Sequence, residues 1–85
     1  MLQSQGKVLV KFYADWCAPC KVLTKIMSDI DVTVPVVEYN VDEDLDETKS
    51  HSIRGVPTLI MLEDGKEVNR ISGSINRDKF LEFIK

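Results

Sequence analysis

The sequence predicts an α/β fold in which three helices flank a four-stranded mixed sheet. Segments rich in β-branched and aromatic residues alternate with segments in which apolar residues recur every three or four positions. With 85 residues, 44% of them hydrophobic and 29% charged, the chain has the composition of one small globular domain. We therefore expect residues 1–85 to form a single unit.

The first half of the chain predicts a strand, a helix and a second strand. Lys7–Tyr13 has almost no polar break, as expected of a central strand buried on both faces. A helix is predicted from about Ala18 to Ile30, because Pro19 suits a first helical turn and apolar residues follow at helical spacing. Residues 34–41 form the next strand, and this order implies a right-handed parallel crossover.

The second half predicts a hairpin and two shorter helices. Residues 58–72 are expected to form an antiparallel hairpin with its turn at 63–65. Residues 43–50 are weakly helical, with Leu45 as their only strong apolar anchor. The last helix, residues 77–85, is expected to place three apolar side chains on one face: Phe80, Leu81 and Ile84.

Charge and hydropathy exclude two classes of partner. The net charge is −3, with 11 basic and 14 acidic residues and no run of Lys or Arg, so nucleic-acid binding is not expected. No apolar run approaches the roughly 18–20 residues that span a membrane, and the first ten residues do not resemble a signal peptide. We expect a cytoplasmic protein, with a monomer as the default.

The only two cysteines, Cys17 and Cys20, are separated by two residues. A disulfide this close encloses too small a loop to stabilise the fold much, and lasting disulfides are rare in the cytoplasm. A structural zinc site would need four ligands, but the chain adds only the distant His51, which we expect at the surface. A reversible redox couple without metal or other cofactor is the favoured interpretation.

The position of each cysteine predicts its role. Cys17 is expected at a helix N-terminus, where free N–H groups and the helix dipole stabilise an attacking thiolate. Cys20, one turn further and more buried, is expected to resolve the mixed disulfide. Ala18 and Pro19 add no charge or side-chain hydrogen bond, so we expect the couple to act as a reductant. Trp16, directly before an exposed nucleophile, is expected to border the substrate surface.

Three motifs together resemble the thioredoxin family. A buried strand is followed by DWCAPCK at Asp15–Lys21, then by IRGVPT at Ile53–Thr58 and SGS at Ser72–Ser74. The resemblance covers about Lys7 to Lys85. It implies a thioredoxin-like fold and a thiol–disulfide oxidoreductase that reduces disulfides in protein substrates. It also implies an electron donor such as a thioredoxin reductase.

The resemblance also implies a substrate surface. Pro57 would be the cis-proline, and Val56 before it would offer backbone hydrogen bonds to an extended substrate peptide. Gly73 would lie in the facing loop and leave room for that peptide. The assignment of Pro57 has independent support, because cis peptide bonds are almost confined to residues that precede proline.

The sequence departs from the family pattern in three places. The usual N-terminal strand and helix are lacking, so the chain looks like a trimmed form near the core shared with glutaredoxins. Ala18 replaces the usual glycine between the cysteines and should stiffen the first helical turn. Lys11 stands where the family carries a buried aspartate, and Glu38 stands where it usually carries lysine.

The exchange of charges leads to a hypothesis about proton transfer. If Lys11 and Glu38 meet, they form a half-buried ion pair beneath Cys20. Glu38, or Lys11 in a transiently neutral form, would then transfer the proton of the resolving thiol through a water. The alternative is that Lys11 extends to solvent and Glu38 is an ordinary surface residue.

Two other functions compete with this interpretation. A glutaredoxin-like enzyme would take electrons from glutathione, and the short N-terminus favours it, whereas the Trp and Ala-Pro of the motif do not. Alternatively, the surface around Trp16, Val56 and Gly73 clamps a partner protein, and redox turnover is incidental. A glutathione-coupled assay distinguishes a glutaredoxin-like enzyme from a thioredoxin. A double Cys→Ser variant with full biological function would favour the partner-binding alternative.

Overall fold

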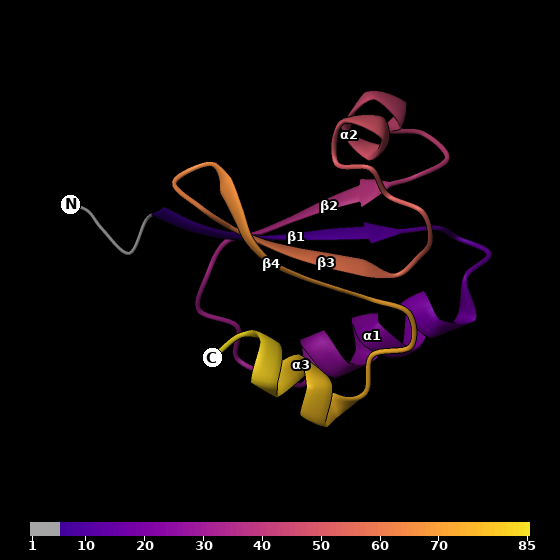
Figure 1. Cartoon of the computed structure of the whole chain (residues 1–85). Helices are drawn as coiled ribbons and strands as arrows, with labels where there is room; N and C mark the ends of the chain where they lie inside the picture. Colours follow the sequence, from indigo (N-terminus) through magenta and orange to yellow (C-terminus); the bar gives the residue numbers. More distant parts are fainter. Residues whose placement is uncertain (1–5) are drawn as a thin grey trace.

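The computed structural model describes residues 6–85, in which a four-stranded sheet has helices on both sides (Figure 1). In chain order the elements are β1 (Lys7–Tyr13), α1 (Ala18–Ser28), β2 (Val36–Asn40), α2 (Leu45–Ser50), β3 (Thr58–Glu63), β4 (Lys66–Ser72) and α3 (Arg77–Phe83). The strand order is β2-β1-β3-β4. β1 runs parallel to β2 and antiparallel to β3, and β4 is antiparallel to β3. The predicted mixed sheet with three helices is confirmed.

β1 is the central strand that its composition predicts. Leu9 and Phe12 are completely buried, and they point to opposite faces of the sheet because side chains alternate along a strand. Leu9 belongs to the larger apolar cluster, with Leu59 of β3. Phe12 belongs to the smaller cluster, with Ile60 of the same neighbouring strand. The central position of β1 thus creates a core on each side of the sheet.

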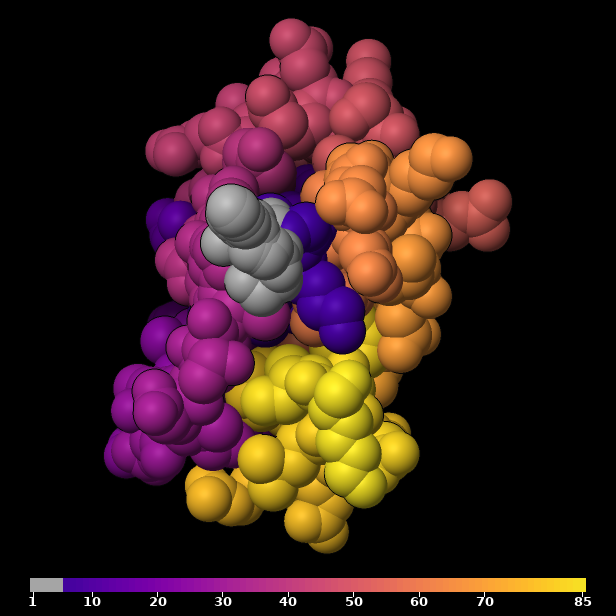
Figure 2. Space-filling model, turned by 90° about the vertical axis from the view of Figure 1, so that its left-hand side faces the viewer, coloured from indigo at the N-terminus to yellow at the C-terminus, as the bar shows by residue number. Residues whose placement is uncertain are grey.

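α1 and α3 cover the same face of the sheet (Figure 1). The larger cluster on this face includes Leu23 from α1 and both Phe80 and Phe83 from α3. In the view turned by 90°, the yellow residues of α3 lie on the opposite side of the molecule from the residues around α2 (Figure 2). α1 and α3 therefore form the main cover of the sheet.

α2 makes only a light cover on the other face. It buries none of its residues, and Leu45 is 59% exposed, so the prediction that Leu45 anchors this helix is wrong. His51, just after α2, instead packs its ring 5.5 Å from the ring of Phe12. His51 is thus half-buried against the smaller core rather than a fully exposed surface residue.

The two longer helices end earlier than predicted. α1 stops at Ser28: the N–H of Asp29 still bonds the carbonyl oxygen of Lys25 four residues back, but the N–H of Ile30 bonds that of Met27, only three residues back. α3 stops at Phe83, and Phe83 is buried with Phe80 three residues earlier. Leu81 is 38% exposed, so its predicted place on the buried face is wrong.

β2 is also shorter than predicted, and the hairpin has the expected turn. Pro35 has no N–H, and only its carbonyl takes part by accepting from Leu9 N at 2.9 Å, so β2 begins after it. Between β3 and β4, Asp64 and Gly65 both have positive φ angles, 56° and 83°. This is the backbone that suits a two-residue hairpin turn.

Candidate active site

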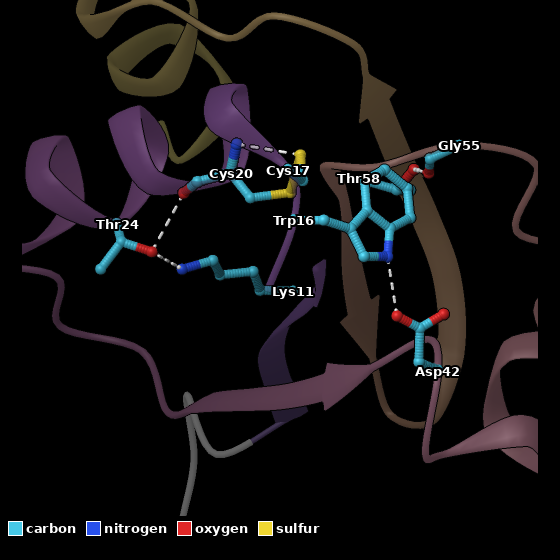
Figure 3. Close-up of a disulfide and its surroundings, with 8 residues drawn as sticks. All are labelled: Lys11, Trp16, Cys17, Cys20, Thr24, Asp42, Gly55 and Thr58. Carbon is cyan, nitrogen blue, oxygen red and sulfur yellow. Dashed lines mark hydrogen bonds between the residues drawn. A yellow bond between two sulfur atoms is a disulfide. The ribbon is translucent and has the colours of Figure 1, made fainter. Parts of the chain in front are cut away.

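Cys17 and Cys20 form a disulfide at the N-terminus of α1, with their Cα atoms 5.2 Å apart (Figure 3). Cys17 is the N-cap residue of the helix, and its Sγ accepts a hydrogen bond from Cys20 N at 3.1 Å. The sulfur therefore takes the place that a serine or aspartate oxygen has in common N-caps. When the disulfide opens, the same N–H and the helix dipole can stabilise a thiolate on Cys17.

The disulfide is covered more fully than the sequence suggested. Cys17 is 4% exposed and Cys20 is 2% exposed, so the expectation of an exposed Cys17 is wrong for the disulfide form. Both residues pack with Ala14, and Val41 and Val56 lie against this cluster. Cys17 is buried because its side chain turns inward to reach both the sulfur and the N–H of Cys20.

Trp16 lies beside the disulfide and is 70% exposed (Figure 3). Its indole Nε1 donates a hydrogen bond to Asp42 Oδ2 at 2.8 Å, which holds the ring over the start of the segment after β2. An open groove of about 260 Å³ runs along the ring, lined by Trp16, Val41, Thr48, Ile53, Arg54, Gly55 and Val56. Sequence reasoning missed Asp42, because it begins an acidic run that is typical of a solvated helix start.

The peptide bond between Val56 and Pro57 is cis, at the beginning of β3. Pro57 is buried, and its carbonyl oxygen accepts a hydrogen bond from Gly73 N at 3.1 Å. Gly73 has a φ of 87°, and apart from its two chain neighbours no described residue would lie within 4 Å of a Cβ atom placed there. The structure therefore brings the loops before β3 and after β4 together and leaves open space at Gly73.

Lys11 and Glu38 are neighbours in the parallel pairing of β1 with β2. Lys11 Nζ lies 3.6 Å from Glu38 Oε2, and the exposed fractions of the two side chains are 3% and 51%. The alternative in which Lys11 extends to solvent is thus contradicted. The pair is half-buried because only Glu38, on the edge strand of the described sheet, reaches water.

Thr24 connects this pair to the disulfide (Figure 3). Lys11 Nζ donates a short hydrogen bond to Thr24 Oγ1, and Thr24 Oγ1 donates to the carbonyl oxygen of Cys20 at 3.0 Å. Lys11 Nζ also lies 5.8 Å from the centre of the Tyr13 ring. Sequence reasoning did not single out Thr24. The available signal was its position four residues after Cys20, where a threonine hydroxyl can bond a helix carbonyl.

Among residues 6–85, no group of three or more His, Cys, Asp or Glu side chains could hold a metal ion. In the same part of the chain, no helix has the length and apolar character needed to cross a membrane.

The profile of the thioredoxin family, described as "Thioredoxin", matches residues 1–85. The chain belongs to the thioredoxin family. A thioredoxin of Chlamydia pneumoniae is 38% identical over 84 residues, which are 95% of this chain and 82% of that relative. A thioredoxin of Chlamydia caviae is 35% identical over 82 residues, 93% of this chain and 80% of the relative. A solved structure of a thioredoxin variant from Halobacterium salinarum superposes with a TM-score of 0.84 at 33% identity, covering 93% of this chain and 72% of that chain.

Family membership and the Cys-x-x-Cys pair together establish the class of activity. The chain is a thiol–disulfide oxidoreductase of the disulfide-reductase type, and its redox group is the cysteine pair. Membership also implies disulfide-containing protein substrates and a reductase that restores the dithiol. The relatives are somewhat longer than this chain, which covers about four fifths of the two chlamydial proteins.

Proposed function

We propose that the protein reduces substrate disulfides in two steps at Cys17 and Cys20. The Cys17 thiolate attacks one sulfur of the substrate disulfide, forms a mixed disulfide and releases the first substrate thiolate. Cys20 then loses its proton, attacks the Cys17 sulfur and releases the second substrate thiolate. After the second step the protein is oxidised, with a Cys17–Cys20 disulfide, and the substrate carries two thiols.

The N-cap geometry is the observation that carries this assignment. Cys17 Sγ already accepts the N–H of Cys20 at 3.1 Å, so a negative charge on Cys17 would gain a donor and the positive end of α1. Cys20 lies within the first turn, and its own N–H is the group that serves Cys17. Cys17 Sγ thus accepts a helix N–H, whereas Cys20 lies inside the helix and supplies that N–H. This difference supports Cys17 as nucleophile and Cys20 as resolving thiol.

Trp16, Val56, Pro57 and Gly73 form the proposed substrate surface. The exposed indole of Trp16 borders the groove that Val56 also lines. Val56 packs against the cysteines, and Gly73 leaves open space beside the loop that bonds Pro57. An extended substrate peptide would pair with the backbone of Val56 and place its disulfide over Cys17.

Lys11 and Glu38 are the proposed route for the proton of the resolving thiol. Their 3.6 Å separation and the half-exposed carboxylate support a path from the buried side of the site to water. Either Glu38 accepts the proton, or Lys11 in a transiently neutral form does so, with a water in between. This role completes the second step, in which Cys20 must become a thiolate.

The proposed setting follows the family and the charge of the chain. Residues 1–85 would act as one cytoplasmic, monomeric domain that is re-reduced by a thioredoxin reductase or an equivalent donor. The net charge of −3 and the lack of a Lys or Arg run favour protein substrates over nucleic acids.

Covalent trapping tests the order of attack. The Cys20→Ser variant should accumulate a stable mixed disulfide with a protein substrate, located at Cys17 by peptide mass spectrometry. The matched Cys17→Ser variant should trap none, because the remaining thiol lies inside the helix. Equal trapping by the two variants would contradict the assignment. Turnover with glutathione and glutathione reductase, but not with thioredoxin reductase, would contradict the proposed electron donor.

A further inference from the structure

The Lys11 ammonium is almost completely buried and depends on one hydrogen-bond acceptor. Its side chain is 3% exposed, and Glu38 Oε2 at 3.6 Å lies beyond hydrogen-bond distance. Within residues 6–85, the acceptor that Lys11 Nζ reaches is Thr24 Oγ1. Because a buried charge needs hydrogen-bonding partners, the hydroxyl of Thr24 is central to how Lys11 is held.

The hydrogen bonds place the Thr24 hydroxyl between Lys11 and Cys20. An ammonium has donors only, so the Thr24 oxygen must accept from it. The single hydroxyl hydrogen of Thr24 is directed to the carbonyl oxygen of Cys20 at 3.0 Å, and that carbonyl can only accept. The Thr24 hydroxyl thus links the side-chain nitrogen of Lys11 to the backbone of Cys20.

We propose that Thr24 is a positioning residue for the resolving step, holding the Lys11 ammonium beside Cys20 so that its charge stabilises the Cys20 thiolate. This inference rests on the proposed function, in which Cys20 attacks second. It narrows that proposal as well, because Lys11 then acts as a fixed cation and Glu38 is left as the group that accepts the proton.

The surrounding charges agree with a net positive field at Cys20. Glu38 from β2 and Tyr13 from β1 lie near the ammonium, and Thr24 links it to the backbone carbonyl of Cys20 on α1. Glu38 is 51% exposed, so water and salt screen its negative charge, whereas the buried Lys11 is screened much less. The cation therefore acts on Cys20 more strongly than the carboxylate offsets it.

Thr24 is suited to a clean substitution experiment. Thr24 as a whole is exposed, although its hydroxyl bonds Lys11. A substitution there should therefore leave the core intact. Thr24→Val removes the hydroxyl at nearly constant shape. Thr24→Ser keeps the hydroxyl and serves as the matched control.

The test separates the two chemical steps with dithiobis(nitrobenzoate). Attack by Cys17 releases one thionitrobenzoate and leaves a mixed disulfide, and attack by Cys20 releases the second as the protein disulfide closes. Stopped-flow absorbance at mildly acidic pH follows the two releases in wild type and variants. We expect the second release to slow about tenfold in Thr24→Val and in Lys11→Met, the change produced by one pH unit in thiol ionisation.

The controls determine whether the effect passes through Lys11. Thr24→Ser should stay within about twofold of wild type, and the first release should be unchanged in all three variants. In a Lys11→Met background, adding Thr24→Val should slow the second release no further, because the two residues act as one unit. A second release in Thr24→Val at the wild-type rate would overturn the inference. Equal slowing in Thr24→Ser, or additive slowing in the double variant, would overturn it as well. Failure of the proposed function looks different: wild type would release only one equivalent, or Cys20→Ser would release two.

Discussion

Lys11 and Glu38 face one another across β1 and β2, but only Lys11 is removed from water. Their charged atoms are 3.6 Å apart, while the exposed fractions of the side chains are 3% and 51%. A pair of this kind stabilises the fold weakly, because desolvation of the buried partner offsets much of the attraction. The link from Lys11 through Thr24 to the Cys20 carbonyl favours a role in the reaction.

Replacing each partner separately tests that role. Lys11→Met should slow disulfide reduction about tenfold near pH 6 and much less near pH 9, because the Cys20 thiolate loses its neighbouring cation. Glu38→Gln should slow disulfide reduction as well, since the variant removes the group proposed to accept the proton of Cys20. The measurement is the turnover rate from about pH 6 to pH 9. Unchanged rates in both variants over this range would exclude Lys11 and Glu38 from the proton transfer.

Trp16 should contribute to binding of protein substrates rather than to the chemistry of the sulfurs. Trp16→Ala removes the wall of the groove and the hydrogen bond to Asp42, so the KM for a protein disulfide should rise about five- to tenfold. Reduction of a small aromatic disulfide should change little. Asp42→Asn keeps an oxygen acceptor for the indole and should have a smaller effect. An equal loss on both substrates in Trp16→Ala would point to damage at the cysteines.

Gly73 should be restricted by its backbone and by the space beside it. Gly73→Ala places a side chain at a φ of 87°, which should cost about 1 kcal/mol of stability in urea unfolding. The new methyl group also enters the open space proposed for substrate, so the KM for a protein disulfide should rise.

Gly65→Ala is the matched control for Gly73. Gly65 has a similar φ of 83° but lies in the turn between β3 and β4. It should lose about the same stability, roughly 1 kcal/mol, and keep its activity. A KM that is unchanged in Gly73→Ala, or raised equally in both variants, would show that Gly73 has no special place at the substrate surface.

The hairpin contains a pH-dependent ion pair. Arg70 donates to Glu67 at 2.8 and 2.7 Å, and this hydrogen bonding holds the pKa of the Glu67 carboxyl below its usual range. A carboxyl with a lowered pKa stabilises the folded state above its unfolded pKa of about 4.3 and loses that effect as the pH falls through the folded value. The pair is about one third exposed, so the contribution should be below about 0.5 kcal/mol.

Urea unfolding of Glu67→Gln measures this contribution. The variant should be slightly less stable than wild type at neutral pH, and the difference should shrink as the pH falls below about 4.3, the unfolded pKa of the carboxyl. A difference that persists at the lower pH would assign the effect to packing rather than to charge.

The parts of the fold that were predicted correctly are those determined by local pattern. Five of the seven residues of Lys7–Tyr13 are apolar or aromatic, and the Asp64-Gly65 turn has a strong local signal, so the central strand and the hairpin followed from sequence. The cysteine pair was equally clear because of its spacing. Helix ends were less predictable. At the C-terminus of α1, the N–H of Ile30 bonds the carbonyl oxygen of Met27, three residues back, which no local pattern predicts. In α3, Phe83 rather than Leu81 faces the sheet.

The site residues that were missed are defined by contacts between distant segments. Asp42 is 26 residues from Trp16, and Thr24 is 13 residues from Lys11. Both look like ordinary polar residues on exposed surfaces when the sequence is read alone. Lys11 and Glu38 could be found because a charge inside a buried strand is unusual, but their contact depends on the register of β1 with β2.

Reduction of insulin disulfides by the purified protein in the presence of dithiothreitol tests the central claim most directly. Wild type should accelerate precipitation of the insulin chains, whereas Cys17→Ser and Cys20→Ser should both lose turnover, since the exchange needs an attacking and a resolving thiol. Absence of turnover in the folded wild-type protein, or turnover that survives in both single variants, would contradict the account.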